Sequence, residues 1–276
     1  GSYTVVLTVT DSNGCIGNIS KLIEVYSLPI ADFSTSPVCL NDVSNFNDLS
    51  SGNVTGWNWD FGDTSTDTLQ NPSHTYASSD TFTVQLIVTT NNGCVDDTSR
   101  MVTVNPKPLA DFTADTVCYG FSSLFTDSSK VLNDIITSWF WDFGDGIFAT
   151  TQFPGISYLY ANSGTFNVQL TVNTNKGCTD SYSSTISVNP LPVTTISADH
   201  TSFRECDGQI TITSAEGTAP YIYYWEDSLG YPVETAPAAT IAPELCPGWY
   251  VVTTTDSNGC SVIDTVAIPE GCGIKC

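Results

Sequence analysis

Apolar residues alternate with mainly polar neighbours along several short stretches of this chain. Residues 82–88 show the pattern well, because every second side chain is Phe, Val or Leu. A period of two places these side chains on one face of a β-strand. The same alternation recurs at residues 3–9 and 166–172, and no stretch carries a convincing helical period. The pattern therefore predicts an all-β protein.

The strands belong to an internal repeat. Its most distinctive part is Trp-Asn-Trp-Asp-Phe-Gly-Asp at residues 57–63, with the counterpart Trp-Phe-Trp-Asp-Phe-Gly-Asp at residues 139–145. Each complete copy later closes with Asn-Gly-Cys or Lys-Gly-Cys, where the glycine is typical of a tight hairpin turn. Modules of this size with about seven short strands form β-sandwiches. Short, proline-containing junctions favour an elongated array of such sandwiches.

The repeat pattern divides the chain into five segments. The last folded segment lacks the Trp-rich stretch but closes with residues 256–260, which are identical to residues 11–15. It is therefore expected to be a related β-sandwich. The expected segments are the closing hairpin of a truncated domain at 1–28, complete domains at 29–107 and 108–191, the related sandwich at 192–270, and a tail at 271–276 that leads to a missing region.

The charge of the chain narrows the classes of partner. Asp and Glu number 29 against 7 Lys and Arg, for a formal net charge of -22. Such a field repels phosphate backbones, so we expect no nucleic-acid binding. We also expect no direct membrane insertion, because no apolar run of about 20 residues is present. Calcium is a natural counter-ion for this surface.

The Trp-x-Trp-Asp-Phe-Gly-Asp motif, followed by a Tyr segment and a Phe/Tyr-x-Val-x-Leu-x-Val strand, resembles the polycystic kidney disease (PKD) domain over residues 1–191. The resemblance implies immunoglobulin-like sandwiches that act as spacers or adhesive modules on large extracellular proteins. The last domain is similar to repeats of flavobacterial gliding adhesins of the SprB type, through Cys-x-Gly-x-Ile and Gly-Thr-Ala-Pro-Tyr. Together the two resemblances imply a Bacteroidota surface protein associated with the outer membrane and exported by the type IX system.

Ten cysteines, none of them in a Cys-x-x-Cys pair, predict disulfides and an oxidising compartment. Each expected bond joins the cysteine that opens a repeat to the cysteine of its closing hairpin. The expected pairs are Cys39–Cys94, Cys118–Cys178 and, by analogy, Cys206–Cys260. Cys246 is expected to bond to Cys272 or Cys276, and Cys15 to a cysteine upstream.

Four aspartates at the ends of the Trp-rich strands are candidate calcium ligands: Asp60, Asp63, Asp142 and Asp145. A calcium site needs six to eight oxygen ligands. An Asp-x-x-Asp pair in a strand and its turn more often accepts backbone N–H groups. Capping of the turn is therefore the favoured interpretation, and catalysis by these pairs is not expected.

Aromatic residues in the last domain are candidates for stacking on sugar rings: Tyr223, Tyr224, Trp225 and Trp249. Alternation cannot bury both Tyr223 and Tyr224, so at least one is expected to face solvent. Local packing of the cluster is the competing interpretation.

The sequence predicts a non-enzymatic segment of a secreted cell-surface adhesin or filament. It would act as a disulfide-linked spacer and adhesive rod in gliding motility or surface attachment. No Gly-x-Ser-x-Gly or His-Glu-x-x-His motif is present. The alternatives are a carbohydrate-binding accessory region of a secreted hydrolase and a subunit of a self-assembling extracellular filament. The expected partners are surface polysaccharide, other glycans or neighbouring copies of the chain.

Overall fold

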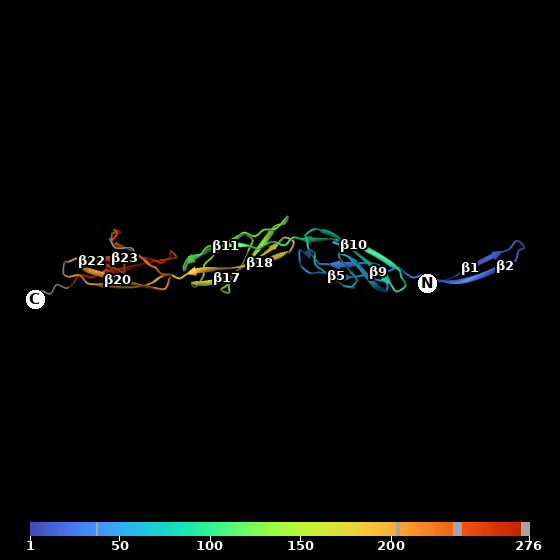
Figure 1. Cartoon of the computed structure of the whole chain (residues 1–276), viewed down its shortest axis with the longest axis horizontal. Helices are drawn as coiled ribbons and strands as arrows, with labels where there is room; N and C mark the ends of the chain where they lie inside the picture. Colours follow the sequence, from blue (N-terminus) through green and yellow to red (C-terminus); the bar gives the residue numbers. More distant parts are fainter. Residues whose placement is uncertain (37, 203–204, 234–238, 272–276) are drawn as a thin grey trace. The chain divides into compact units, whose positions relative to one another are not determined.

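A computed structural model describes residues 1–36, 38–202, 205–233 and 239–271 of the chain (Figure 1). Every regular element in these ranges is a β-strand. None of the described segments is a helix of the length and apolarity that a membrane span requires. The chain forms two compact units, of which the first contains Gly1–Pro108 together with the loops Val131–Ile136 and Asn173–Thr179.

The first unit contains a two-sheet sandwich formed by strands β3 to β10, which we call the first repeat. One sheet has the strand order β4-β10-β9-β6-β7 and the other β3-β5-β8. The strands are β3 (Phe33–Thr35), β4 (Val38–Cys39), β5 (Ser44–Asp48), β6 (Val54–Asp60), β7 (Thr66–Asp67), β8 (Ser73–His74), β9 (Thr81–Thr90) and β10 (Val95–Asn105).

Aromatic side chains from both sheets form the centre of this sandwich. Trp59 of β6 is fully buried, and its ring lies 5.2 Å from the ring of Phe33 in an edge-to-face arrangement. The alternating face of β9 covers the same core, because Val84 and Leu86 are also completely buried. The Trp-rich stretch is therefore a core strand, and its aromatic residues stabilise the sandwich by burial.

The first unit also contains a two-stranded hairpin of β1 (Ser2–Thr10) and β2 (Ile16–Glu24). Every residue of both strands is exposed, including the apolar ones. This hairpin thus presents an alternating apolar face that no described segment covers.

The strands β11 to β18 form a second sandwich of the same topology, which we call the second repeat; most of it lies in the second unit, which begins at Leu109. Its sheets have the orders β12-β18-β17-β14-β15 and β11-β13-β16. The strands are β11 (Phe112–Ala114), β12 (Val117–Cys118), β13 (Ser123–Asp127), β14 (Ile136–Asp142), β15 (Phe148–Thr151), β16 (Gly155–Tyr158), β17 (Gly164–Thr174) and β18 (Thr179–Asn189). Trp141 occupies the core position of Trp59 and is likewise fully buried.

The last domain is a smaller sandwich of two three-stranded sheets, β19-β20-β22 and β21-β23-β24. Its strands are β19 (Val193–Asp199), β20 (Gly208–Ala215), β21 (Ile222–Asp227), β22 (Ile241–Leu245), β23 (Gly248–Thr255) and β24 (Ser261–Ile268). Ile210, Trp225 and Val252 lie in its core. The predicted fold class, tandem immunoglobulin-like β-sandwiches, is confirmed.

A glycine corner ends the Trp-rich strand of the first repeat. Gly62 has a φ of 79°, and a Cβ there would lie 2.6 Å from the carbonyl oxygen of Thr83 on β9. Gly93, in the β9–β10 turn, has a similar φ of 77° but no atom within 4 Å of its Cβ position. A side chain at position 93 would therefore meet only the strain of a positive φ, whereas one at position 62 would also collide with the β9 backbone.

We expect Gly93→Ala to lower the free energy of unfolding by about 1 kcal/mol, because alanine is disfavoured at positive φ. Gly62→Ala should cost about 1 to 3 kcal/mol more, because the methyl group also collides with the β9 backbone. Denaturant unfolding of the two variants measures the difference. Equal losses would contradict the close approach of the corner to β9.

Candidate functional site

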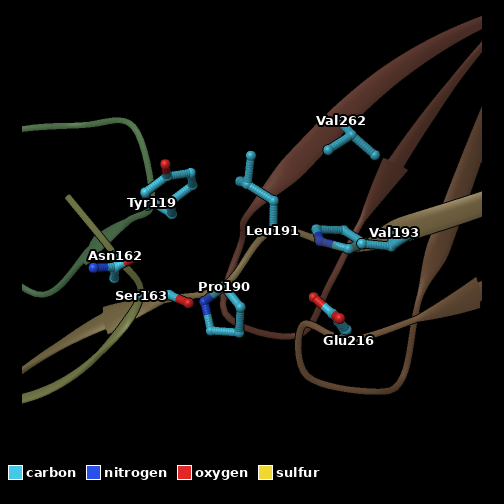
Figure 2. Close-up of a pocket in the computed structure, with 9 residues that line it drawn as sticks. Tyr119, Asn162, Ser163, Pro190, Leu191, Val193, Glu216 and Val262 are labelled. Atoms are coloured by element: carbon cyan, nitrogen blue, oxygen red, sulfur yellow. The ribbon is translucent and has the colours of Figure 1, made fainter. Parts of the chain in front are cut away.

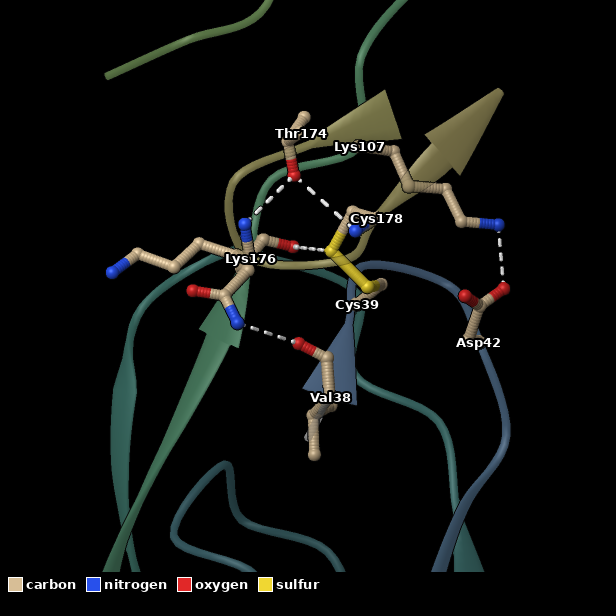
Figure 3. The surroundings of a disulfide bond; sticks show 8 residues. Val38, Cys39, Asp42, Lys107, Thr174, Lys176 and Cys178 are labelled. Atoms are coloured by element: carbon tan, nitrogen blue, oxygen red, sulfur yellow. Dashed lines mark hydrogen bonds and ion pairs between the residues drawn. A yellow bond between two sulfur atoms is a disulfide. The ribbon is translucent and has the colours of Figure 1, made fainter. Parts of the chain in front are cut away.

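Two disulfides join neighbouring domains, and we call them the junction disulfides. The first is Cys39–Cys178, with the two Cα atoms 5.7 Å apart (Figure 3). Cys39 lies on β4, which pairs in parallel with the end of β10 so that Cys39 is opposite Asn105. Cys178 lies in the turn between β17 and β18 of the second repeat. Both residues belong to the first compact unit.

The turn that carries Cys178 is fixed by local hydrogen bonds. The N–H of Cys178 donates to the Thr174 hydroxyl at 3.2 Å, and the N–H of Thr174 donates to the Cys178 carbonyl at 2.9 Å. Cys178 is fully buried, and its Sγ lies 4.0 Å from the carbonyl oxygen of Asn105. A surface ion pair between Lys107 and Asp42 lies beside the bond (Figure 3) and contributes little because both groups are solvated.

The second junction disulfide, Cys118–Cys260, repeats this arrangement inside the second unit, with a Cα separation of 5.5 Å. Cys118 on β12 lies opposite Asn189 of β18. Cys260 is buried in the turn between β23 and β24, where its N–H donates to Asp256 Oδ1 at 2.8 Å. In both cases the opening cysteine of one domain is bonded to the hairpin cysteine of the next.

The predicted pairings Cys39–Cys94 and Cys118–Cys178 are therefore wrong. The reason is the register of the opening strand. Cys39 lies at the Asn105 end of β10, whereas Cys94 precedes the other end of that strand. The 11 residues of β10 place its two ends about 33 Å apart, far beyond the Cα separation of about 7 Å that a disulfide allows. The same register separates Cys118 from Cys178 along β18.

The predicted pair Cys206–Cys260 is also wrong, because Cys260 is bonded to Cys118 in the second junction. Cys206 is bonded to Cys246 instead, so the expected bond from Cys246 to Cys272 or Cys276 is also wrong. Pairing of Gly208 with Leu245 brings the two together at one end of the last domain. Cys272 and Cys276 lie outside the described residues. Within the residues that the structure describes, Cys94 and Cys15 have no disulfide partner.

The four candidate calcium ligands cap the turns after β6 and β14. Asp60 Oδ1 accepts the N–H of Gly62 at 2.8 Å, and Asp63 Oδ1 accepts that of Ser65 at 3.0 Å. In the second repeat Asp142 and Asp145 accept the N–H groups two residues further on, at 2.9 and 3.1 Å. Within the described residues, no three His, Cys, Asp or Glu side chains gather as a metal site would require.

The second carboxylate oxygen of Asp63, and that of Asp145, contacts a ring that stacks on a core aromatic residue. His74 Nε2 lies 2.7 Å from Asp63 Oδ2, and its ring is parallel to Phe61 at 4.3 Å. In the second repeat Tyr158 takes the same place, donating to Asp145 and stacking on Phe143 at 3.8 Å. A histidine and a tyrosine thus serve one structural role, which explains why histidine is not required there.

Ionisation in these corners follows from burial and hydrogen bonding. Partial burial acts to raise the pKa of Asp63, but the hydrogen bonds from His74 and Ser65 outweigh it, and the net pKa lies below the usual value. Burial, followed by the hydrogen bond to Asp145, raises the pKa of Tyr158 to about 12. At neutral pH the aspartate is therefore charged and the tyrosine protonated.

The aromatic residues predicted to bind glycans do not form one platform. Tyr223 and Trp225 are buried in the core of the last domain. Tyr224 and Trp249 remain 51% and 61% exposed. Pairing of Tyr224 with Thr253 places it on the same outer face as Trp249, because Trp249 and Thr253 are four residues apart on β23.

Sequence reasoning gave no sign of an open cleft of about 550 Å³ beside the second junction (Figure 2). Tyr119 lines it from the residue after Cys118, and Val262 lines it from β24. Leu191 of the linker and Val193 at the start of β19 contribute apolar surface, and Glu216 contributes the one carboxylate of its lining. The signal available in sequence was the proline-rich linker itself, which could not reveal the cleft's shape.

The PKD domain family matches residues 27–104 and 105–189, which together make up more than half of the chain. The chain belongs to the PKD domain family. The pre-pro-metalloprotease PrtV of Vibrio cholerae is 34% identical over 97 residues, 34% of this chain but only 10% of the protease. The chain thus spans a small part of that curated relative.

Two solved PKD domains of Vibrio proteins are similar to about a third of the chain. The PKD1 domain of Vibrio anguillarum Epp is 31% identical, with 30% of this chain and 95% of that one covered and a TM-score of 0.28. The PKD1 domain of the Vibrio cholerae metalloprotease PrtV is 32% identical, with 30% and 96% covered and a TM-score of 0.27.

The lowered pKa of Asp63 predicts acid-sensitive stability. A carboxylate with a depressed pKa stabilises the fold above its unfolded pKa of about 3.9, and this contribution is lost as pH falls through the folded pKa. We expect Asp63→Asn to lower the free energy of unfolding by about 1 to 3 kcal/mol at pH 7. Near pH 2 the difference in free energy of unfolding between Asp63→Asn and the parent should shrink, because Asp63 is then protonated in an increasing fraction of the parent protein.

Denaturant unfolding between pH 2 and 7 measures this effect. Asp97→Asn, a substitution of an exposed carboxylate that accepts a hydrogen bond from Gln85, is the matched control and should cost within about 0.5 kcal/mol. A pH-independent loss for Asp63→Asn would show that the corner does not depend on the charge.

Proposed function

We propose that this chain is a non-catalytic, disulfide-linked spacer within a large extracellular surface protein. The proposed domain boundaries lie at 28/29, 107/108 and 191/192. Membership of the PKD family and three disulfides support an oxidising, extracellular setting. The similarity of the last domain to SprB-type repeats supports the finer proposal of a Bacteroidota adhesin at the outer membrane, exported by the type IX system for gliding or attachment.

The observation that carries the proposal is the overlap of the two junction disulfides. Cys39–Cys178 closes a loop of 139 residues and Cys118–Cys260 one of 142, and each loop contains a cysteine of the other. Three chain segments consequently connect the two junctions in parallel: residues 39–118, 118–178 and 178–260. A pulling force is shared among these segments, and the shortest one sets the largest possible separation of the junctions.

The third disulfide shortens one of these segments further. Cys206–Cys246 bypasses 40 residues of the segment 178–260. About 42 residues then remain on the shortest covalent path, a span of about 150 Å when fully extended. Without disulfides, about 221 residues separate Cys39 from Cys260, a span of about 750 Å. The disulfides therefore reduce the largest possible distance between Cys39 and Cys260 to about one fifth of its value in the reduced chain. A spacer under mechanical load requires such a limit.

Single-molecule stretching of the full chain from its ends tests this mechanism. We expect reduction to add about 600 Å to the final contour length, since about 179 more residues become extensible. The double variant Cys206→Ser/Cys246→Ser, stretched while oxidised, should gain only about 60 Å because the segment 118–178 then becomes limiting. Equal contour lengths before and after reduction would reject the mechanical role.

A carbohydrate-binding accessory region is the second candidate function. The observation in its favour is the outer face of the β21-β23-β24 sheet, where Tyr224 and Trp249 are exposed. Exposed aromatic rings on an acidic domain suit stacking on sugar rings.

A glycan array probed with the full chain tests this second candidate. If the face binds sugar, Trp249→Ala should weaken binding to any retained glycan at least about tenfold, as expected for the loss of an aromatic anchor. Tyr231→Ala, at an equally exposed aromatic in a turn, is the control and should leave binding unchanged. An array with no retained glycan would remove this candidate.

A further inference from the structure

Cys94 lies in the β9–β10 turn, which is equivalent to the turns that carry the two bonded hairpin cysteines, Cys178 and Cys260. The N–H of Cys94 donates to the Thr90 hydroxyl at 3.2 Å, the distance found between Cys178 and Thr174. The N–H of Thr90 donates to the Cys94 carbonyl at 2.9 Å, again as in the second repeat. The turn is thus already formed around a cysteine that has no partner in the described residues.

The β1–β2 hairpin supplies the surroundings of a third junction. It matches β9–β10 at a constant offset of 79 residues, so that Cys15 corresponds to Cys94 and Tyr26 to Asn105. Tyr26 and Ser27 form a small cleft with Thr90 and Asn91 of the Cys94 turn. The Cys94 turn therefore lies beside Tyr26, as the Cys178 turn lies beside Asn105.

The first repeat shows which strand belongs in that position. Val38 and Cys39 of β4 pair in parallel with Val104 and Asn105, which places Cys39 next to Cys178. A strand paired in the same register with Val25 and Tyr26 would place its cysteine next to Cys94.

The exposed apolar face of the β1–β2 hairpin is too large for a single strand to cover, and indicates that the remaining strands of a sandwich cover it. Val5, Leu7 and Val9 are 50%, 59% and 57% exposed, whereas their counterparts Val84, Leu86 and Val88 are completely buried. A groove lined by Leu7, Val9 and Ile19 lies on this face. Apolar surface of this kind is stabilised when the remaining strands of a domain cover it.

We infer that Cys94 forms a third junction disulfide with the opening cysteine of a PKD-like domain whose closing hairpin is β1–β2. Cys15 then bonds to the opening cysteine of the domain before that one. The bond forms by oxidation of two thiols, with two protons and two electrons passing to a disulfide oxidant of the extracellular or periplasmic compartment. Which cysteines pair does not depend on whether the chain acts as a spacer.

The missing strands can be supplied from the chain itself. Residues 29–79, fused in front of Gly1 of the full chain, restore a complete domain at the natural offset of the repeat. Val43→Ile in the added copy makes its Cys39 peptide heavier by one methylene than the Cys39 peptide of the original chain. The side chain at this position is exposed, so the change should not disturb the core. Thiol labelling and peptide mapping of the unreduced protein then identify the partner of each cysteine.

We expect the added Cys39 to be linked to Cys94, with Cys15 remaining open to labelling. Cys39→Ser in the added copy is the control and should restore labelling of Cys94. A link from the added Cys39 to Cys15, a labelled Cys94, or a bond between two chains would each overturn the inference.

A second measurement avoids dependence on folding of the extended chain. In the native protein purified without reduction, the peptide containing Cys94 should be linked to an upstream peptide that contains an opening-strand cysteine. A free Cys94 thiol, or a small-molecule thiol attached to it, would contradict the third junction.

Discussion

The pairing of a two-residue opening strand with the end of the last long strand determines how these domains are linked. In the first repeat β4 pairs with the Asn105 end of β10, and in the second β12 pairs with the Asn189 end of β18. Each opening cysteine is therefore held at the end of its sandwich opposite to its own hairpin turn. The hairpin turn of the following domain carries the cysteine that comes within bonding distance.

This register changes what the disulfides do. A bond within one sandwich would stabilise that sandwich alone, mainly by constraining its unfolded state. The junction disulfides instead close overlapping loops, so the second repeat contributes one cysteine to each junction. Separation of the two junctions is then limited by the covalent paths between them, independently of the stability of any single sandwich. The mechanical proposal follows from this connectivity.

Much of the fold could be predicted from sequence because it depends on local patterns. Alternation identified the core strands, and the Gly-Asp corners were correctly interpreted as capped turns. Alternation also indicated that Tyr223 and Tyr224 could not both be buried, and the structure buries Tyr223 and exposes Tyr224. The common role of His74 and Tyr158 became clear only in the structure, where each stacks on the phenylalanine of its own corner.

The disulfide partners could not be predicted by the same reasoning. Repeats show which cysteines are equivalent, but a bond within each domain and a bond to the next domain use equivalent positions equally well. The choice depends on the end of β10 at which β4 pairs, and two residues of strand carry no hydrophobic period that could indicate it.

Peptide mapping of the unreduced full chain tests the central claim most directly. It should recover Cys39 linked to Cys178 and Cys118 linked to Cys260, as the register of β4 and β12 requires. Recovery of Cys39 linked to Cys94, or of Cys118 linked to Cys178, would confine the bonds to single domains and contradict the account.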